Sequence, residues 1–155
     1  MNSQEFLRKI EIELKISKNS QYTLRNYLKA NKIFLDFIKK IPDEIKEDDV
    51  KMFQAEHLSE VSSSSIIIFL SALKYAYSNI LKFDPTINIK RPKREKRIPS
   101  VLTKNEVKRL MEAVVNIKSK LMISMLYACG FRVSELTNLK IVDLDFNESI
   151  GYIKQ

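Results

Sequence analysis

The sequence contains very few of the residues on which most metal and nucleotide chemistry depends. Its 155 residues include one cysteine, one histidine and two glycines. A single cysteine excludes an internal disulfide and any zinc site built from several cysteines. Two glycines are too few for the glycine-rich loops that bind nucleotide phosphates. We therefore expect no metal and no cofactor.

Long hydrophobic runs are also missing. No apolar run approaches the roughly 18–20 residues that a membrane-spanning helix needs, and Met1 does not begin a signal peptide. The sequence therefore predicts a protein with no membrane partner and a cytoplasmic location. Its hydrophobic fraction of 45% is ordinary and is enough for a packed core.

Positive charge is in excess. Lysine and arginine number 27 against 19 acidic residues, which gives a formal net charge of +8. Residues 83–99 hold six basic and two acidic residues, half of that excess. Such a field attracts polyanions, with nucleic acid as the first candidate. Pro85, Pro92 and Pro99 favour an extended chain, so we expect a flexible basic linker in preference to an ordinary solvated run of charges.

This linker divides the chain into residues 1–82 and residues 100–155. Apolar residues at helical spacing predict four helices in the first part, arranged as two helical hairpins. The segment from Ser17 to Ser20 and the serines at positions 62–65 are suited to begin helices, and Pro42 is expected to end the second one. The first part is therefore predicted to be a small helical domain.

The second part is predicted to contain three helices and one strand. Residues 103–106 form a capping box at the start of the first helix. The second, about residues 118–129, closes at Gly130, which suits a left-handed C-cap, and a short helix follows over residues 133–139. Residues 150–153 predict a strand after a polar turn. A lone strand leaves backbone groups unpaired, so we expect this domain to be incomplete within the 155 residues.

One stretch of the second part resembles a known catalytic motif. Residues 127–139, Tyr-Ala-Cys-Gly-Phe-Arg-Val-Ser-Glu-Leu-Thr-Asn-Leu, and the Asp-Leu-Asp of residues 143–145 resemble the first catalytic motif of tyrosine recombinases of the phage-integrase and Xer type. The basic linker and the helix after Thr103 are similar to the same family. Residues 20–37 and 62–77 resemble its N-terminal core-binding domain, so the resemblance spans the whole chain.

The resemblance implies a mainly α fold. Residues 1–82 would form a four-helix, SAM-like core-binding domain that binds DNA, and residues 83–99 the linker. Residues 100–155 would form the first helices and first strand of an α+β catalytic domain, truncated here.

The resemblance also implies site-specific DNA recombination. In this family a tyrosine cleaves a DNA strand and forms a 3′-phosphotyrosyl intermediate, which conserves the bond energy without metal or cofactor. Arg132 would be the first catalytic arginine, stabilising charge on the phosphate oxygens bidentately. Glu135, one helical turn later, would orient it. The alternative is an ordinary surface ion pair between helix neighbours.

The family needs further active-site residues after this arginine: a hairpin lysine, a His-x-x-Arg motif, another His or Trp, and the nucleophilic tyrosine. The 155 residues contain no arginine and no histidine after Arg132. Lys140 is in the wrong place for the catalytic lysine, and Lys154 lies a few residues before its expected position. We therefore expect the chain to be inactive in cleavage by itself and to retain DNA binding.

The other residues that could carry chemistry are expected to be structural. Tyr27, Tyr77 and Tyr127 are predicted as core residues. Cys129 is expected to be a small buried side chain, and His57 a surface or partly buried residue of its helix.

Double-stranded DNA is the expected partner. In the family the two domains enclose the duplex, and helices of the N-terminal domain lie at the major groove. The candidate DNA-binding residues are Arg25, Lys29, Lys74, Lys90, Arg91, Lys93 and Arg94, with Thr23 and Ser71 as phosphate donors. The alternative for each is a solvated surface group without a partner.

Three classes of function remain open from the sequence. The first is a site-specific recombinase cut short, and the second is a natural, non-catalytic DNA-binding regulator of a full-length recombinase. The third, a helical interaction protein with no role on nucleic acid, is disfavoured by the basic linker and the arginine motif. Complete family members assemble as tetramers on two DNA sites, which implies self-association on DNA.

Overall fold

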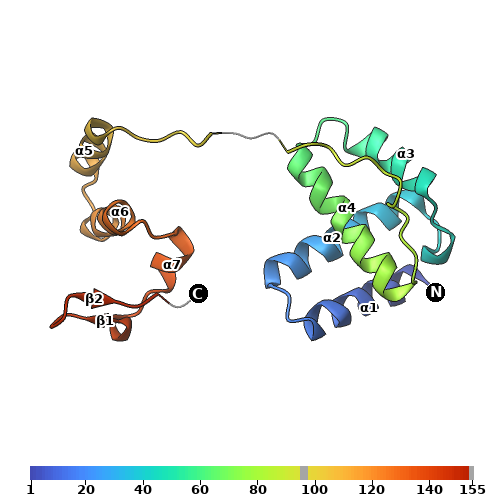
Figure 1. The fold of residues 1–155 in the computed structure, drawn as a ribbon, viewed down its shortest axis with the longest axis horizontal. Helices are drawn as coiled ribbons and strands as arrows, with labels where there is room; N and C mark the ends of the chain where they lie inside the picture. Colours follow the sequence, from blue (N-terminus) through green and yellow to red (C-terminus); the bar gives the residue numbers. More distant parts are fainter. Residues whose placement is uncertain (95–97, 154–155) are drawn as a thin grey trace. The chain divides into compact units, whose positions relative to one another are not determined.

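In the computed structural model, which describes residues 1–94 and 98–153, the protein is built mainly of helices (Figure 1). Lys96 and Arg97 of the basic segment, and Lys154 after the last strand, lie outside the described residues. No helix in the described part of the chain is long and apolar enough to cross a membrane.

The first compact unit spans residues 1–97, and its described residues form four α-helices. They are α1 (Ser3–Ile16), α2 (Gln21–Ile38), α3 (Glu47–His57) and α4 (Ser63–Ile80), with a 3-10 turn η1 (Pro42–Glu44) before α3. Helix α2 packs against α1, α3 and α4, and α2 and α4 lie side by side (Figure 1). The predicted mainly helical fold is confirmed.

Serine caps begin two of these helices, as the sequence predicts. The Ser20 hydroxyl accepts a hydrogen bond from the Thr23 amide at 3.1 Å, at the start of α2. The Ser62 hydroxyl accepts one from the Ser65 amide at 3.4 Å, at the start of α4. Each contact satisfies one of the backbone amides that the first helical turn leaves without a partner.

The end of α2 differs from the prediction. The helix stops at Ile38, four positions before Pro42. Lys39 has a left-handed backbone (φ 54°), and its amide donates to the carbonyl of Leu35 at 2.9 Å. This conformation ends the helix before proline geometry can act.

Aromatic side chains hold the core of this unit together. The rings of Phe6 and Tyr77 lie 4.9 Å apart between centroids, and those of Phe34 and Phe53 lie 5.5 Å apart. Tyr77 is fully buried, which confirms its predicted place in the core. The inward positions predicted for α1 and α4 are buried at Phe6, Ile10, Leu14, Phe69, Leu70, Leu73 and Tyr77.

A buried amide fixes α2 against α4. The Nδ2 atom of Asn31 donates to the carbonyl of Tyr27 at 2.9 Å and to that of Ala72 at 3.2 Å. Asn31 has no exposed surface. The buried Nδ2 group is thereby hydrogen-bonded, and its contact with the Ala72 carbonyl joins α2 to α4.

The chain after α4 returns across the helices. The Thr86 amide and hydroxyl both donate to Asp84, at 2.9 and 2.6 Å, and Thr86 is buried. The Asn88 side chain donates to Glu47 of α3 at 2.8 Å, and Ile89 packs against the core. The beginning of the segment predicted as a linker is thus docked onto the first unit.

The second unit, residues 98–155, carries the arginine motif. Its described elements are α5 (Lys104–Ala113), α6 (Ile117–Cys129), α7 (Val133–Asn138), a 3-10 turn η2 (Ile141–Asp143), β1 (Leu144–Asp145) and β2 (Ile150–Gly151). Thr103 and Glu106 form the predicted capping box of α5. The expectation of a single unpaired strand is wrong, because β2 pairs antiparallel with β1.

Two burial predictions fail in this unit. Cys129 is exposed, and Tyr127 exposes 60% of its surface. Within residues 98–153 only Leu136 and Asp143 are buried, so no described element covers this side of α6. The apolar pattern of α6 predicted a helix correctly but did not determine what lies against it.

Candidate functional site

A polar surface on α4 brings together Ser71, Lys74 and Arg91, three residues selected from the sequence. Ser71, Lys74 and Ser78 stand at spacing i, i+3 and i+7, which places them on one face of the helix. Arg91, on the returning chain, donates from Nη1 to the Ser71 hydroxyl at 3.3 Å. These side chains line a cavity of about 570 Å³ together with Tyr27, Tyr75 and Asn79. We call this set the α4 polar surface.

Sequence reasoning missed several members of this surface. The ring of Tyr75 lies 5.6 Å from that of Tyr27, edge to face, and its hydroxyl lies 3.3 Å from the Ser17 hydroxyl. The Asn79 amide donates to the Tyr75 carbonyl at 2.8 Å. The helical spacing that relates Ser71 to Tyr75 and Ser78 was the available signal.

An acidic residue partly neutralises the α4 polar surface. The Lys74 ammonium lies 3.5 Å from the Asp84 carboxylate, whose side chain is 13% exposed. Burial tends to raise the pKa of Asp84, but the hydrogen bonds from Thr86 and the charge of Lys74 outweigh it. The pKa of Asp84 therefore lies below its usual value, and the carboxylate is ionised at neutral pH.

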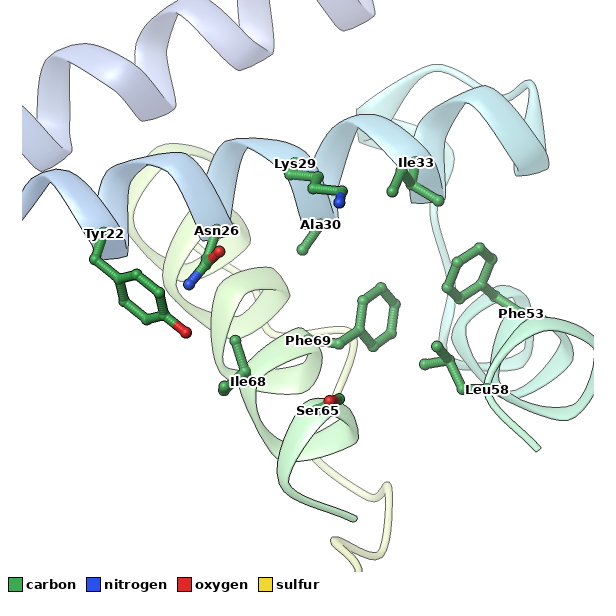
Figure 2. Close-up of a pocket in the computed structure, with 10 residues that line it drawn as sticks. All are labelled: Tyr22, Asn26, Lys29, Ala30, Ile33, Phe53, Leu58, Ser65, Ile68 and Phe69. Atoms are coloured by element: carbon green, nitrogen blue, oxygen red, sulfur yellow. The ribbon is translucent and has the colours of Figure 1, made fainter. Parts of the chain in front are cut away.

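The candidates on α2 lie apart from the α4 polar surface. Arg25 and Lys29 are both exposed and stand one helical turn apart. The Arg25 guanidinium lies 5.8 Å from the centre of the Tyr22 ring. Lys29 lines a groove of about 400 Å³ between α2 and α4 (Figure 2). The Thr23 hydroxyl contacts the Ser20 hydroxyl at 2.9 Å as part of the helix cap.

The remaining DNA-binding candidates are three basic residues next to Arg91 in the chain. Lys90, Lys93 and Arg94 are exposed, and none forms an ion pair with a residue that the structure describes. Their charges are therefore available to an anionic partner. Only Arg91 of this group has a described side-chain contact with the helical bundle.

The arginine of the second unit is presented by a sharp change of chain direction. Helix α6 ends at Gly130, whose backbone is left-handed (φ 67°), a conformation that glycine adopts without strain. Arg132 follows as the N-cap of α7 in an extended conformation. Its side chain is 77% exposed. The turn thus sets the arginine at the start of a helix, facing solvent.

Glu135 holds this arginine at two atoms. Its carboxylate accepts the Arg132 backbone amide at 2.7 Å and the guanidinium Nη1 at 2.6 Å. These hydrogen bonds, the backbone one first, hold the pKa of Glu135 below its usual value. A guanidinium has five N–H donors. Nη1 engages the carboxylate, and the other nitrogens are free to bind a phosphate.

The other residues considered for chemistry make structural contacts and do not form a catalytic or metal-binding cluster in the described part of the chain. His57 is exposed, and its ring stacks on Phe53 at 5.0 Å between centroids. No group of three or more His, Cys, Asp or Glu side chains within residues 1–94 and 98–153 could hold a metal ion.

Both units match established families. Residues 100–155 match the phage integrase family, and residues 5–86 match the N-terminal SAM-like domain of phage integrases. Tyrosine recombinase XerA of Pyrococcus horikoshii is 33% identical over 152 residues, which cover 97% of this chain and 50% of that protein. Tyrosine recombinase XerD of Oceanobacillus iheyensis is 31% identical over 158 residues, covering 91% of this chain and 52% of that protein.

Two solved structures are also similar to this chain. The crystal structure of XerA recombinase aligns with a TM-score of 0.51 at 32% identity, covering 99% of this chain and 56% of that one. An integrase from mycobacterium phage Brujita has the same fold, with a TM-score of 0.54 at 19% identity over 96% of this chain and 53% of its own. The chain thus spans about half the length of the relatives that it matches.

Proposed function

The chain belongs to the phage integrase family of tyrosine recombinases, and we propose that it binds duplex DNA through α2, the α4 polar surface and the basic residues beside Arg91. The observation that carries this proposal is the contact of Arg91 with Ser71. It places a guanidinium beside a lysine, two serine hydroxyl groups and an amide. Such donors bind phosphate oxygens and position a protein on the duplex.

The domain organisation follows from the same proposal. Residues 1–82 would serve as the core-binding domain, residues 83–99 as the linker along the duplex, and residues 100–155 as the catalytic-domain portion. The contacts of Asp84 with Lys74 of α4 and of Asn88 with Glu47 of α3 support a linker whose first residues are held in place.

We further propose that the protein takes part in site-specific recombination through a 3′-phosphotyrosyl intermediate. Arg132 would bind the non-bridging oxygens of the attacked phosphate, where negative charge develops in the transition state. Glu135 would act as a positioning residue, since its two hydrogen bonds limit how the guanidinium can turn. Self-association on DNA would accompany the complete reaction.

By themselves, the 155 residues are proposed to bind DNA without cleaving it. They contain neither arginine nor histidine after Arg132, and removing several members of a cooperative active site leaves almost no activity.

The salt dependence of binding tests the first proposal. Fluorescence anisotropy of a labelled 30-base-pair duplex should give a log–log slope of about −4 to −5, which corresponds to about five neutralised phosphates. A slope near zero would contradict the proposal. Arg132→Ala should leave this binding nearly unchanged, but it should abolish strand transfer when introduced into an active full-length recombinase that contains this sequence. Equal loss of binding would refute the catalytic assignment of Arg132.

A further inference from the structure

Buried residues are rare around the arginine motif, and one of them is charged. Within the described residues 98–153, only Leu136 and Asp143 are buried, each with 8% of its surface exposed. Leu136 is apolar and belongs to α7, so its burial is ordinary. A carboxylate is seldom buried unless it is hydrogen-bonded. The burial of Asp143 therefore indicates a specific role at this place in the fold.

Asp143 connects the end of α7 with the β-hairpin. Its Oδ2 atom accepts the backbone amide of Lys140 at 3.1 Å, two residues after α7 ends, and this contact caps the 3-10 turn η2. Its backbone amide donates to the Lys140 carbonyl at 2.9 Å. Its carbonyl accepts the amide of Tyr152, directly after β2, at 2.9 Å. The chain leaving α7 is thereby held on the hairpin.

The carboxylate of Glu135 lies at this junction. Glu135, Lys140, Asp143 and Tyr152 are among the residues that line one cavity of about 90 Å³. The side chain of Glu135 is only 15% exposed, whereas the side chain of Arg132, which it holds, is 77% exposed. The Glu135 end of this pair therefore lies against the junction that Asp143 makes, and the guanidinium faces solvent.

Helix α7 depends on such a support. It has six residues, and a helix this short is not stable by itself in water. Within the described chain it packs against α6, it buries Leu136, and its end is held at the Asp143 junction. Arg132 is its N-cap and Glu135 lies in its first turn. Loosening the end of so short a helix should therefore disturb both residues.

We propose that Asp143 is a positioning residue for the arginine motif. By holding the end of α7 on the β-hairpin, it keeps Glu135 where its carboxylate can orient the guanidinium of Arg132. This proposal rests on the function proposed above for Arg132 and adds a residue that acts through Glu135. The role requires no contact between Asp143 and DNA, because the hydrogen bonds that carry it are made to the backbone of the second unit.

Asp145, the other acidic residue of the Asp-Leu-Asp sequence, provides a matched control. It is exposed, and its Oδ1 atom accepts the amides of Asn147 at 2.9 Å and Glu148 at 3.1 Å, both within the turn of the hairpin. Asp145 does not line the cavity that contains Glu135. Its removal should loosen the turn and leave α7 in place.

The experiment compares Asp143→Ala with Asp145→Ala in the full 155-residue chain. NMR follows the Glu135 carboxyl carbon and the Arg132 amide during an acid titration. In the unchanged chain, hydrogen bonds from Arg132 hold the pKa of Glu135 below its usual 4.5. Asp143→Ala should move the inflection upward toward 4.5, because the pair is formed in fewer molecules. Asp145→Ala should leave the inflection unchanged.

The direction of the shift separates positioning from charge and from stability. Removing the negative charge of Asp143 would by itself lower the pKa of Glu135, which is the opposite direction. A purely structural role would lower the melting temperature but leave the inflection of the folded molecules unchanged. Asp143→Asn keeps an oxygen that can accept the Lys140 amide, so it should prevent the upward shift. If Asp143→Ala fails to fold by circular dichroism, Asp143→Glu, which displaces the carboxylate by one CH2 group, is judged by the same shift.

Strand transfer links the proposal to the reaction. In an active full-length recombinase that contains this sequence, Asp143→Ala should reduce strand transfer by about 100-fold, the effect of a small misplacement of a catalytic group, and leave duplex binding unchanged. An inflection that stays in place or falls, or an equal rise for Asp145→Ala, would overturn the proposal. If the inflection rises but Arg132→Ala leaves strand transfer intact, Asp143 positions the pair and the catalytic assignment of Arg132 is wrong.

Discussion

Glu135 contacts Arg132 twice, at the backbone amide (2.7 Å) and at the guanidinium (2.6 Å), so one carboxylate both caps α7 and orients the arginine. Stabilising the helix end and positioning the side chain are thereby coupled. A change at Glu135 should disturb both together, whereas a change at Arg132 that keeps its backbone amide should leave the cap in place.

The contact between Glu135 and Arg132 should change with pH only in the acidic range. Because the pKa of Glu135 lies below its usual value of 4.5, the contact is present above that value and is lost as pH falls through the lower folded-state pKa. The Arg132 amide shift, followed by NMR during an acid titration, should inflect below pH 4.5. Glu135→Gln should abolish the inflection, and an inflection above 4.5 would contradict the contact.

Arg91→Ala should weaken binding of duplex DNA and reduce the magnitude of the salt slope by about 0.9, the value of one phosphate contact. Arg91 is singled out because it is held on the α4 polar surface by Ser71. Arg8→Ala, which removes the same charge from the exposed surface of α1, is the control. Equal effects of the two substitutions would mean that only net charge matters.

Asp84→Asn should strengthen DNA binding by about two- to fivefold, because an ion pair whose lysine is exposed to solvent is worth up to about 1 kcal/mol. The substitution releases Lys74 from its 3.5 Å contact. Glu11→Gln, which frees Lys15 on α1 in the same way, should have a smaller effect. Anisotropy titrations at one salt concentration compare the two, and similar gains would refute a specific role for Lys74.

Asp49 should make the first unit sensitive to acid. Its carboxylate binds Lys40 at 2.6 Å and accepts the Lys46 amide at 2.9 Å. Burial opposes ionisation, but these contacts outweigh it and lower the pKa of Asp49 from its usual 3.8. The stabilisation is present above pH 3.8 and is lost below it. Urea unfolding at pH 7 should show a loss of about 1–2 kcal/mol for Asp49→Asn, and Asp48→Asn should show little.

Tyr77→Phe should raise the free energy of unfolding by about 1 kcal/mol, since a buried hydroxyl without a partner costs roughly that much. The Tyr77 hydroxyl has no hydrogen-bond partner among the described residues, and burial raises its pKa. Tyr75→Phe is the contrasting variant, because its hydroxyl meets Ser17. A lower melting temperature for Tyr77→Phe would show that the hydroxyl is satisfied in solution.

Local features of this protein could be predicted from sequence. Phe6, Ile10 and Leu14 are buried as their spacing requires, and the three-residue separation of Arg132 and Glu135 brings those side chains into contact. Such features depend on one helix at a time, for which periodicity is sufficient.

Features that join distant segments could not be predicted. Arg91 meets Ser71 across 20 positions, and Asn88 meets Glu47 across 41. The groove likewise exists only because α2 lies beside α4, and no pattern within α2 reveals that. The prediction for Tyr127 failed in the opposite direction. Its apolar helix face indicated burial, but no described element covers it.

Position 130, two residues before Arg132, is well suited to a study of which substitutions the turn tolerates. A Cβ atom added there would meet no atom within 4 Å, so crowding does not restrict this site. The left-handed backbone conformation alone restricts which residues can stand at this position. Tolerance among substitutions should therefore rank by ease of that conformation, with asparagine and aspartate ahead of alanine and β-branched residues last. A saturation library at this single codon would report how strongly selection preserves the turn that delivers Arg132.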